Sequence, residues 1–114
     1  MIKKFGNYET RRETGDTGAS YSNILDITNS ARYQSHSIGI QNYGAETMFA
    51  KVLLYKDVDS LYPEEWVSET SIAVGDLLTV DLIEKPCARI LVQAKNNSGS
   101  TSYEVASTSR GKNA

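Results

Sequence analysis

The fold class is decided by the stretch ARILVQAK, residues 88–95, in which two kinds of side chain alternate. Successive side chains of a β-strand point to opposite faces of the sheet, so this period of two predicts a strand with one buried and one solvated face. The face predicted to be buried comprises Ala88, Ile90, Val92 and Ala94. A half-buried strand of this kind is typical of antiparallel sheets.

Further runs of β-branched and aromatic residues flank this strand, with turn-forming clusters between them. They are residues 21–28, 33–41, 48–56, 66–72, 77–83 and 101–107. Seven strands in about ninety residues predict an all-β fold, an antiparallel seven-stranded sandwich that is immunoglobulin-like or related. The phase of each strand predicts a core of Ile38, Ile40, Val52, Leu54, Val80, Leu82, Ile90, Val92 and Val105.

The two ends of the sequence lack this pattern. Residues 1–20 are rich in charge, Gly and Thr and carry only scattered apolar groups, which predicts a flexible N-terminal arm. The arm is either a frayed terminus or a segment that orders against a neighbouring subunit. We therefore expect residues 21–109 to fold without it as the sandwich domain, and residues 110–114 to form a loose tail.

Composition narrows the possible partners. A length of 114 residues fits one domain, and a net charge of -2 gives no basic field for nucleic acid. One cysteine excludes an intramolecular disulfide and a cysteine-rich zinc site. No apolar run approaches the roughly 20 residues of a membrane span, so we expect no membrane contact and synthesis in the cytoplasm.

Candidate catalytic and metal-binding residues are few. Nucleophilic catalysis would need Cys87 or a serine beside a base, and the only histidine is His36. His36 shares a strand face with Ile38, and we assign the side chains of His36 and Cys87 to packing. The loop with Asp57, Asp59, Glu64 and Glu65 offers oxygen ligands of the kind that calcium prefers, in a spacing that favours a solvated acidic loop. We therefore predict no enzyme activity, no catalytic residues, no cofactor and no metal.

A partner-binding surface is predicted from apolar residues that an isolated sandwich would leave uncovered. The strand 48–56 is apolar on both faces, and a contiguous exposed apolar patch usually marks an interface. Tyr55, Tyr62 and Trp66 bracket the neighbouring loop, where exposed aromatic rings bind sugars or protein surfaces. Trp66, the lone tryptophan, is either a core residue or a contact residue. The predicted partner-binding residues are Phe49, Leu53, Tyr55, Tyr62 and Trp66.

Two stretches carry a resemblance to known domains. ARILVQAKNNSGSTSYEV, residues 88–105, looks like the last hairpin of fibronectin type III and immunoglobulin-like domains. A wider span, residues 31–111, resembles a family of small β-sandwich domains found in phage and prophage structural gene sets. The residues that carry this second resemblance are Ala31-Arg32, His36-Ser37-Ile38, Asn42-Tyr43-Gly44, the Trp66 region, Ala73-Val74-Gly75-Asp76, Ala88-Arg89-Ile90 and Val92-Gln93-Ala94.

The resemblance implies a non-enzymatic structural or interaction protein of a phage virion, either capsid-decorating or a head-to-tail auxiliary protein. Its partners would be capsid or tail subunits or copies of itself, in a homo-oligomer or multi-copy assembly within the virion. The alternative is a carbohydrate- or cell-surface-binding module, in which Tyr55, Tyr62 and Trp66 would stack on a sugar.

Overall fold

The computed structural model describes residues 1–57, 59–85 and 87–111. Within these residues the chain forms nine strands and one 3-10 turn, η1 (Ser30–Arg32). The strands are β1 (Ile2–Phe5), β2 (Tyr8–Asp16), β3 (Ser22–Ile27), β4 (Ser35–Asn42), β5 (Met48–Tyr55), β6 (Glu64–Ile72), β7 (Leu77–Ile83), β8 (Arg89–Asn96) and β9 (Ser102–Arg110). None of the described segments is a helix of the length and apolarity that crossing a membrane requires.

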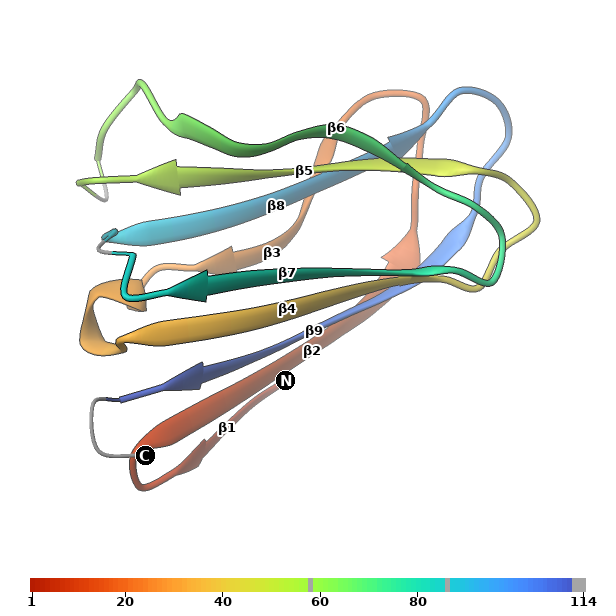
Figure 1. Ribbon diagram of the computed structural model, residues 1–114. Helices are drawn as coiled ribbons and strands as arrows, with labels where there is room; N and C mark the ends of the chain where they lie inside the picture. Colours follow the sequence, from red (N-terminus) through yellow and green to blue (C-terminus); the bar gives the residue numbers. More distant parts are fainter. Residues whose placement is uncertain (58, 86, 112–114) are drawn as a thin grey trace.

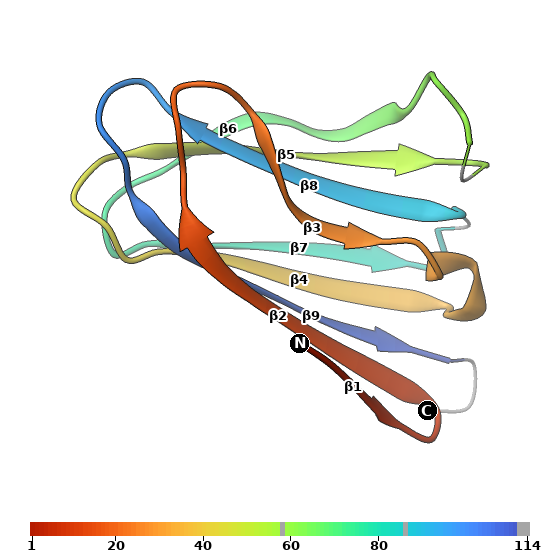
Figure 2. The same ribbon diagram turned by 180° about the vertical axis from the view of Figure 1, so that it is seen from behind.

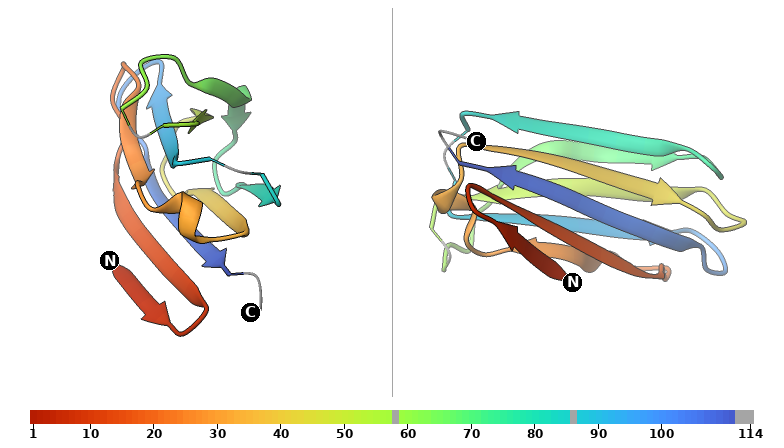
Figure 3. Two further views of the ribbon diagram at one scale, coloured as in Figure 1. Left: turned by 90° about the vertical axis from the view of Figure 1, so that its left-hand side faces the viewer. Right: turned by 90° about the horizontal axis from the view of Figure 1, so that it is seen from below.

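The strands form two facing sheets, which confirms the predicted antiparallel sandwich (Figures 1 and 2). One sheet has five strands in the order β1-β2-β9-β4-β7, and the other has four in the order β3-β8-β5-β6. The end-on view in Figure 3 shows the interior between the two sheets. Every predicted core residue, from Ile38 to Val105, is buried there.

The strand pairing is nested along the chain. β2 pairs with β9, β3 with β8, β4 with β7, and β5 with β6. The β4–β9 and β5–β8 pairs then join these four pairs into two sheets. This is the strand order of a jelly roll, a double-sheet sandwich of Greek keys, with β1 added at one edge. An immunoglobulin sandwich has a different strand order.

The prediction of a flexible arm at residues 1–20 is wrong for most of that segment. β1 and β2 form a hairpin, and β2 pairs with β9 over its full length, from Tyr8 opposite Arg110 to Asp16 opposite Ser102. The seven predicted strands are present, each within three residues at either end, but the sandwich has nine. Arg110 ends β9 instead of beginning a loose tail, and residues 112–114 of that predicted tail lie outside the described residues.

The strands alternate in direction, so the sandwich has two distinct ends. The odd-numbered strands finish at one end, together with η1 and residues 56–57, 59–63, 84–85 and 87–88; we call this the η1 end. The even-numbered strands finish at the other, together with the loops 17–21, 43–47, 73–76 and 97–101; we call this the far end. In Figure 1 the η1 end is on the left and the far end on the right.

Candidate functional site

The structure separates the five predicted partner-binding residues into two groups. Tyr62 and Trp66, at the η1 end, are 88% and 41% exposed. Phe49, Leu53 and Tyr55 lie on the outer face of β5 and are half-buried by the chain itself. Between the two alternatives for Trp66, its exposure favours a contact residue.

The outer face of β5 is covered by neighbouring side chains. Leu91, directly opposite Leu53 on β8, is only 4% exposed. The Lys51 Nζ lies 4.2 Å above the centre of the Tyr21 ring, and the Arg89 guanidinium lies 5.0 Å from the centre of the Tyr55 ring. Long basic side chains cover apolar surface with their methylene stems, so the chain itself covers part of this face and leaves Phe49, Leu53 and Tyr55 partly exposed.

Trp66 is held in place by a charged neighbour. The Lys85 Nζ lies 4.8 Å from the centre of the Trp66 ring and 3.2 Å from the Glu64 Oε2. Lys85 belongs to the loop between β7 and β8, so this contact links the two sheets at their open edge. One face of the indole ring is therefore occupied by an ammonium group.

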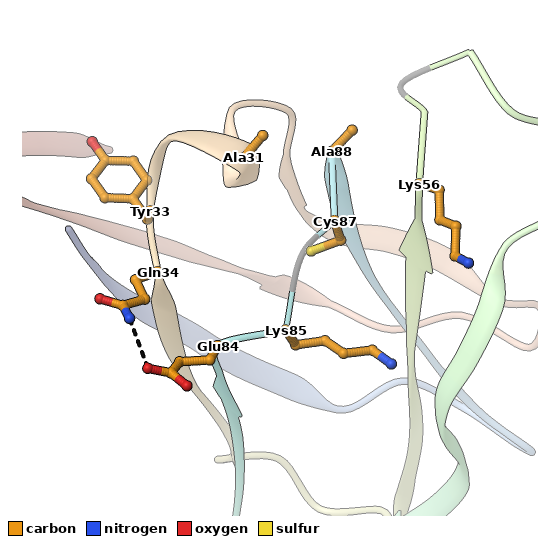
Figure 4. Close-up of a pocket in the computed structure, with 8 residues that line it drawn as sticks. All are labelled: Ala31, Tyr33, Gln34, Lys56, Glu84, Lys85, Cys87 and Ala88. Atoms are coloured by element: carbon orange, nitrogen blue, oxygen red, sulfur yellow. Dashed lines mark hydrogen bonds between the residues drawn. The ribbon is translucent and has the colours of Figure 1, made fainter. Parts of the chain in front are cut away.

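A hollow of about 710 Å³ lies beside these residues at the η1 end. It is lined by Ala31, Tyr33, Gln34, Lys56, Glu84, Lys85, Cys87 and Ala88. Figure 4 shows Tyr33 on one side of the hollow and the ammonium groups of Lys56 and Lys85 on the other. Gln34 donates a hydrogen bond of 2.8 Å to Glu84 across its rim. The volume falls within the range of ligand-sized pockets, about 300–1,000 Å³.

His36 and Cys87 both contact Ser30. The His36 Nε2 lies 3.2 Å from the Ser30 carbonyl, and the Cys87 Sγ lies 3.6 Å from the Ser30 hydroxyl. Both side chains are buried, as their assignment to packing predicts. A carbonyl oxygen only accepts, so His36 donates through Nε2, and its Nδ1 accepts from Ser109 at 2.7 Å. With both ring nitrogens occupied, His36 has no free base to offer Cys87.

Burial lowers the pKa of His36 from its ordinary value of 6.5, and the nearby Arg11 lowers it further, although the Ser30 carbonyl and Glu9 act in the opposite direction. The folded chain therefore binds fewer protons than the unfolded chain below about pH 6.5. We expect the free energy of unfolding to fall as the pH drops from 6.5 through the folded pKa, by up to about 1.4 kcal/mol per pH unit. His36→Gln should remove this component in urea titrations at pH 7.5 and 5.5. If the free energy of unfolding changes equally between the two pH values for the parent and for His36→Gln, the prediction is wrong.

A buried polar cluster connects β2 to η1, and the sequence analysis missed it. Glu9, 1% exposed, accepts hydrogen bonds from Arg11 at 3.2 Å and from Asn29 at 3.1 Å. Arg11 also donates to the side-chain oxygen Oδ1 of Asn29 at 2.7 Å. Glu9 Oε1, Arg11 Nε and Ser107 Oγ, all buried, have no hydrogen-bond partner among the described residues. The only sequence signal was the placement of Glu9, Arg11 and Glu13 at every second position, on one face of a strand. A strand face of three charged residues predicts exposure to solvent, not burial.

The acidic loop does not gather into a metal site. No group of three or more His, Cys, Asp or Glu side chains in the described part of the chain is placed to hold a metal ion. Asp57 instead accepts a 2.9 Å hydrogen bond from the backbone of Asp59, and Glu64 pairs with Lys85.

Comparison with known proteins identifies the fold and no family. No protein-family model matches the sequence, and no curated protein sequence is significantly similar to it. The crystal structure of PirA is similar with a TM-score of 0.62 and 8% identity, covering 85% of this chain and 90% of PirA. A structure of Bacillus endospore appendages, described as disulfide-linked pili, has a TM-score of 0.55 and 9% identity, over 93% of this chain and 90% of that one. A capsid structure of Helicobacter pylori bacteriophage KHP30 has a TM-score of 0.51 and 9% identity, over 89% of this chain and 86% of that one.

These identities show a shared fold alone. The resemblance to a phage sandwich family has no support from a family model, although one similar structure comes from a phage capsid.

Proposed function

We propose that this chain is a non-enzymatic structural protein of a phage virion, present in many copies as a capsid-decorating or head-to-tail auxiliary protein. It would be made in the host cytoplasm and bind capsid or tail subunits or copies of itself. The fold supports this proposal, because similar structures come from a phage capsid and from bacterial pili. Fold similarity alone is weak evidence of function, so the proposal depends on the surface.

The observation that carries it is the collection of exposed apolar side chains at the η1 end. Strand ends and loops there expose Phe5, Tyr8, Leu61, Tyr62, Trp66 and Ile83. Leu61, Tyr62 and Trp66 lie close together in sequence at the start of β6, whereas Phe5 and Tyr8 lie on the β1–β2 hairpin at the edge of the other sheet. Exposed aromatic and aliphatic side chains are typical of protein interfaces. Tyr62 and Trp66 are the proposed central contacts, with Phe49, Leu53 and Tyr55 on the adjoining sheet face.

The sugar-binding alternative has less support from the same residues. A sugar stacks on an open aromatic face, and the ammonium group of Lys85 already covers one face of Trp66. A catalytic role has less support as well, because both His36 nitrogens are engaged and Cys87 is buried.

The test is the composition of purified particles from the phage or prophage that encodes the chain. We expect mass spectrometry of density-purified particles to find the chain in many copies per particle. We expect Tyr62→Ser with Trp66→Ser to lower its incorporation about tenfold or more. The matched control, Val74→Ser with Leu77→Ser, removes exposed apolar groups from the far end of the sandwich and its adjoining strand. If the protein is present in the lysate but absent from the purified particles, the proposal is wrong.

A further inference from the structure

The turn between β4 and β5, residues 43–47, is a rigid projection at the far end (Figure 1). Its support is the side chain of Asn42, which is fully buried. The Asn42 amide donates to the carbonyls of Glu46 and Ile72 at 2.8 and 2.9 Å. Its carbonyl oxygen accepts from the Gly44 backbone at 3.0 Å and from the Thr101 hydroxyl at 2.7 Å. All four hydrogen-bonding positions of this amide are therefore used to fix the turn.

Gly44 seats the same turn directly on the start of β9. A Cβ atom at this position would lie 1.9 Å from the Thr101 hydroxyl oxygen and 2.5 Å from the Ser102 backbone nitrogen, so only glycine fits. The turn nevertheless exposes Tyr43, which is 61% accessible, together with Glu46. An exposed aromatic ring on a preformed turn loses little conformational entropy when it binds.

The hollow at the opposite end offers complementary chemistry. Tyr33, Ala31 and Ala88 supply apolar surface, and Lys56 supplies a positive charge that has no ion pair among the described residues. Glu46 likewise has no ion pair within the described ranges. A turn that carries Tyr43 and Glu46 therefore matches a hollow that carries apolar walls and Lys56.

The basic side chains are also unequally divided between the two ends. Asp16, Glu46 and Asp76 lie at the far end, whose described loops contain no lysine or arginine. The η1 end carries the basic residues Arg32, Lys56, Lys85 and Arg110, and also the acids Asp57, Asp59, Glu64, Glu65 and Glu84. Of these acids, Glu84 already accepts a hydrogen bond from Gln34, and Asp57 from the backbone of Asp59. The far end is acidic, and the η1 end is the one that offers it basic partners.

We infer that the occupant of the hollow is the 43–47 turn of a second copy of this chain, with Tyr43 against its apolar wall and Glu46 beside Lys56. This inference rests on the proposed function and names the partner surface for assembly. The contact joins two different surfaces, so it is heterologous and extends head to tail into a ring or a filament.

A pair of blocked variants tests the contact. Tyr43→Ser with Glu46→Ser removes the inserting turn, and Ala31→Glu with Lys56→Glu fills the hollow and reverses its charge. All four positions are exposed, so both variants should keep the parent circular dichroism and thermal midpoint. Thr79→Glu, on the exposed outer face of β7, is the control for added negative charge.

We expect sedimentation of the parent and of Thr79→Glu to show a mean mass that rises above 12.6 kDa with concentration, over about 10 μM to 1 mM. Raising the salt concentration should weaken this association. Each blocked variant alone should associate about tenfold or more weakly. Their equimolar mixture should form a dimer and no larger species, because it contains one intact turn and one intact hollow.

A parent chain that stays monomeric, blocked variants that still associate, or a mixture that does not dimerise would each overturn the inference. The proposed function fails by a separate measurement, the absence of the chain from particles. A chain that is present in particles but monomeric in solution would refute the head-to-tail contact alone.

Discussion

A chain that lacks residues 1–16 is expected not to fold, whereas a chain that lacks only residues 1–6 is expected to fold. The longer deletion removes β2, which pairs with β9 over nine residues and covers the interior beside Val105. It leaves β9 as an unprotected edge and exposes buried Ser107 and Ser109. The loss should exceed the few kcal/mol by which a domain of this size is stable.

The shorter deletion is the matched control. It removes only β1, an edge strand of exposed residues that pairs with nothing beyond β2. We expect its thermal midpoint to fall by about 4–8 °C, as a loss near 1 kcal/mol would produce. Circular dichroism and heat denaturation of both chains check the pair. A cooperative transition in the chain without residues 1–16 would show that β2 is dispensable.

The fold was predictable wherever strand faces differ in polarity. Residues 88–95 alternate between apolar and mostly polar side chains because one face of β8 packs into the sandwich, and that alternation is visible in the sequence. β2 gave no such signal, because its inward face at this corner is Glu9, Arg11 and Glu13. A strand of polar residues resembles a flexible arm in the sequence. The burial of β2 depends on Asn29 and β9, which are far away in sequence.

The candidate site was predictable only in part, for a related reason. Tyr62 and Trp66 stand beside a proline and acidic residues, which favours a loop end, and they are exposed. Phe49, Leu53 and Tyr55 satisfied the same apolar criterion. Tyr21 and Arg89, from other segments, and Lys51 of β5 itself cover part of that face. Sequence periodicity gives the side of a strand on which a residue lies, and it does not reveal which long side chains cover that side.

Glu9→Ala is expected to lower the free energy of unfolding by about 3–5 kcal/mol, as removal of one partner from a buried ion pair does. Glu9 is 1% exposed, and its carboxylate is the acceptor for Arg11, whose side chain is itself nine-tenths buried. Without that carboxylate the guanidinium keeps only Asn29 as a hydrogen-bond acceptor and remains in the interior as an uncompensated charge. Urea denaturation at neutral pH measures the loss as a shift of the midpoint.

Two further chains separate charge from packing. Glu9→Gln keeps the size and an acceptor oxygen but removes the charge, so it should lie between the parent and Glu9→Ala. Glu9→Leu combined with Arg11→Leu removes both charges and should be more stable than Glu9→Ala, because no buried charge is left unpaired. If the double variant is instead the least stable of the three, the cluster stabilises the fold through its hydrogen bonds to Asn29 and not through charge pairing. The buried corner of β2 would then join the sheets as a polar network that only its full set of partners supports.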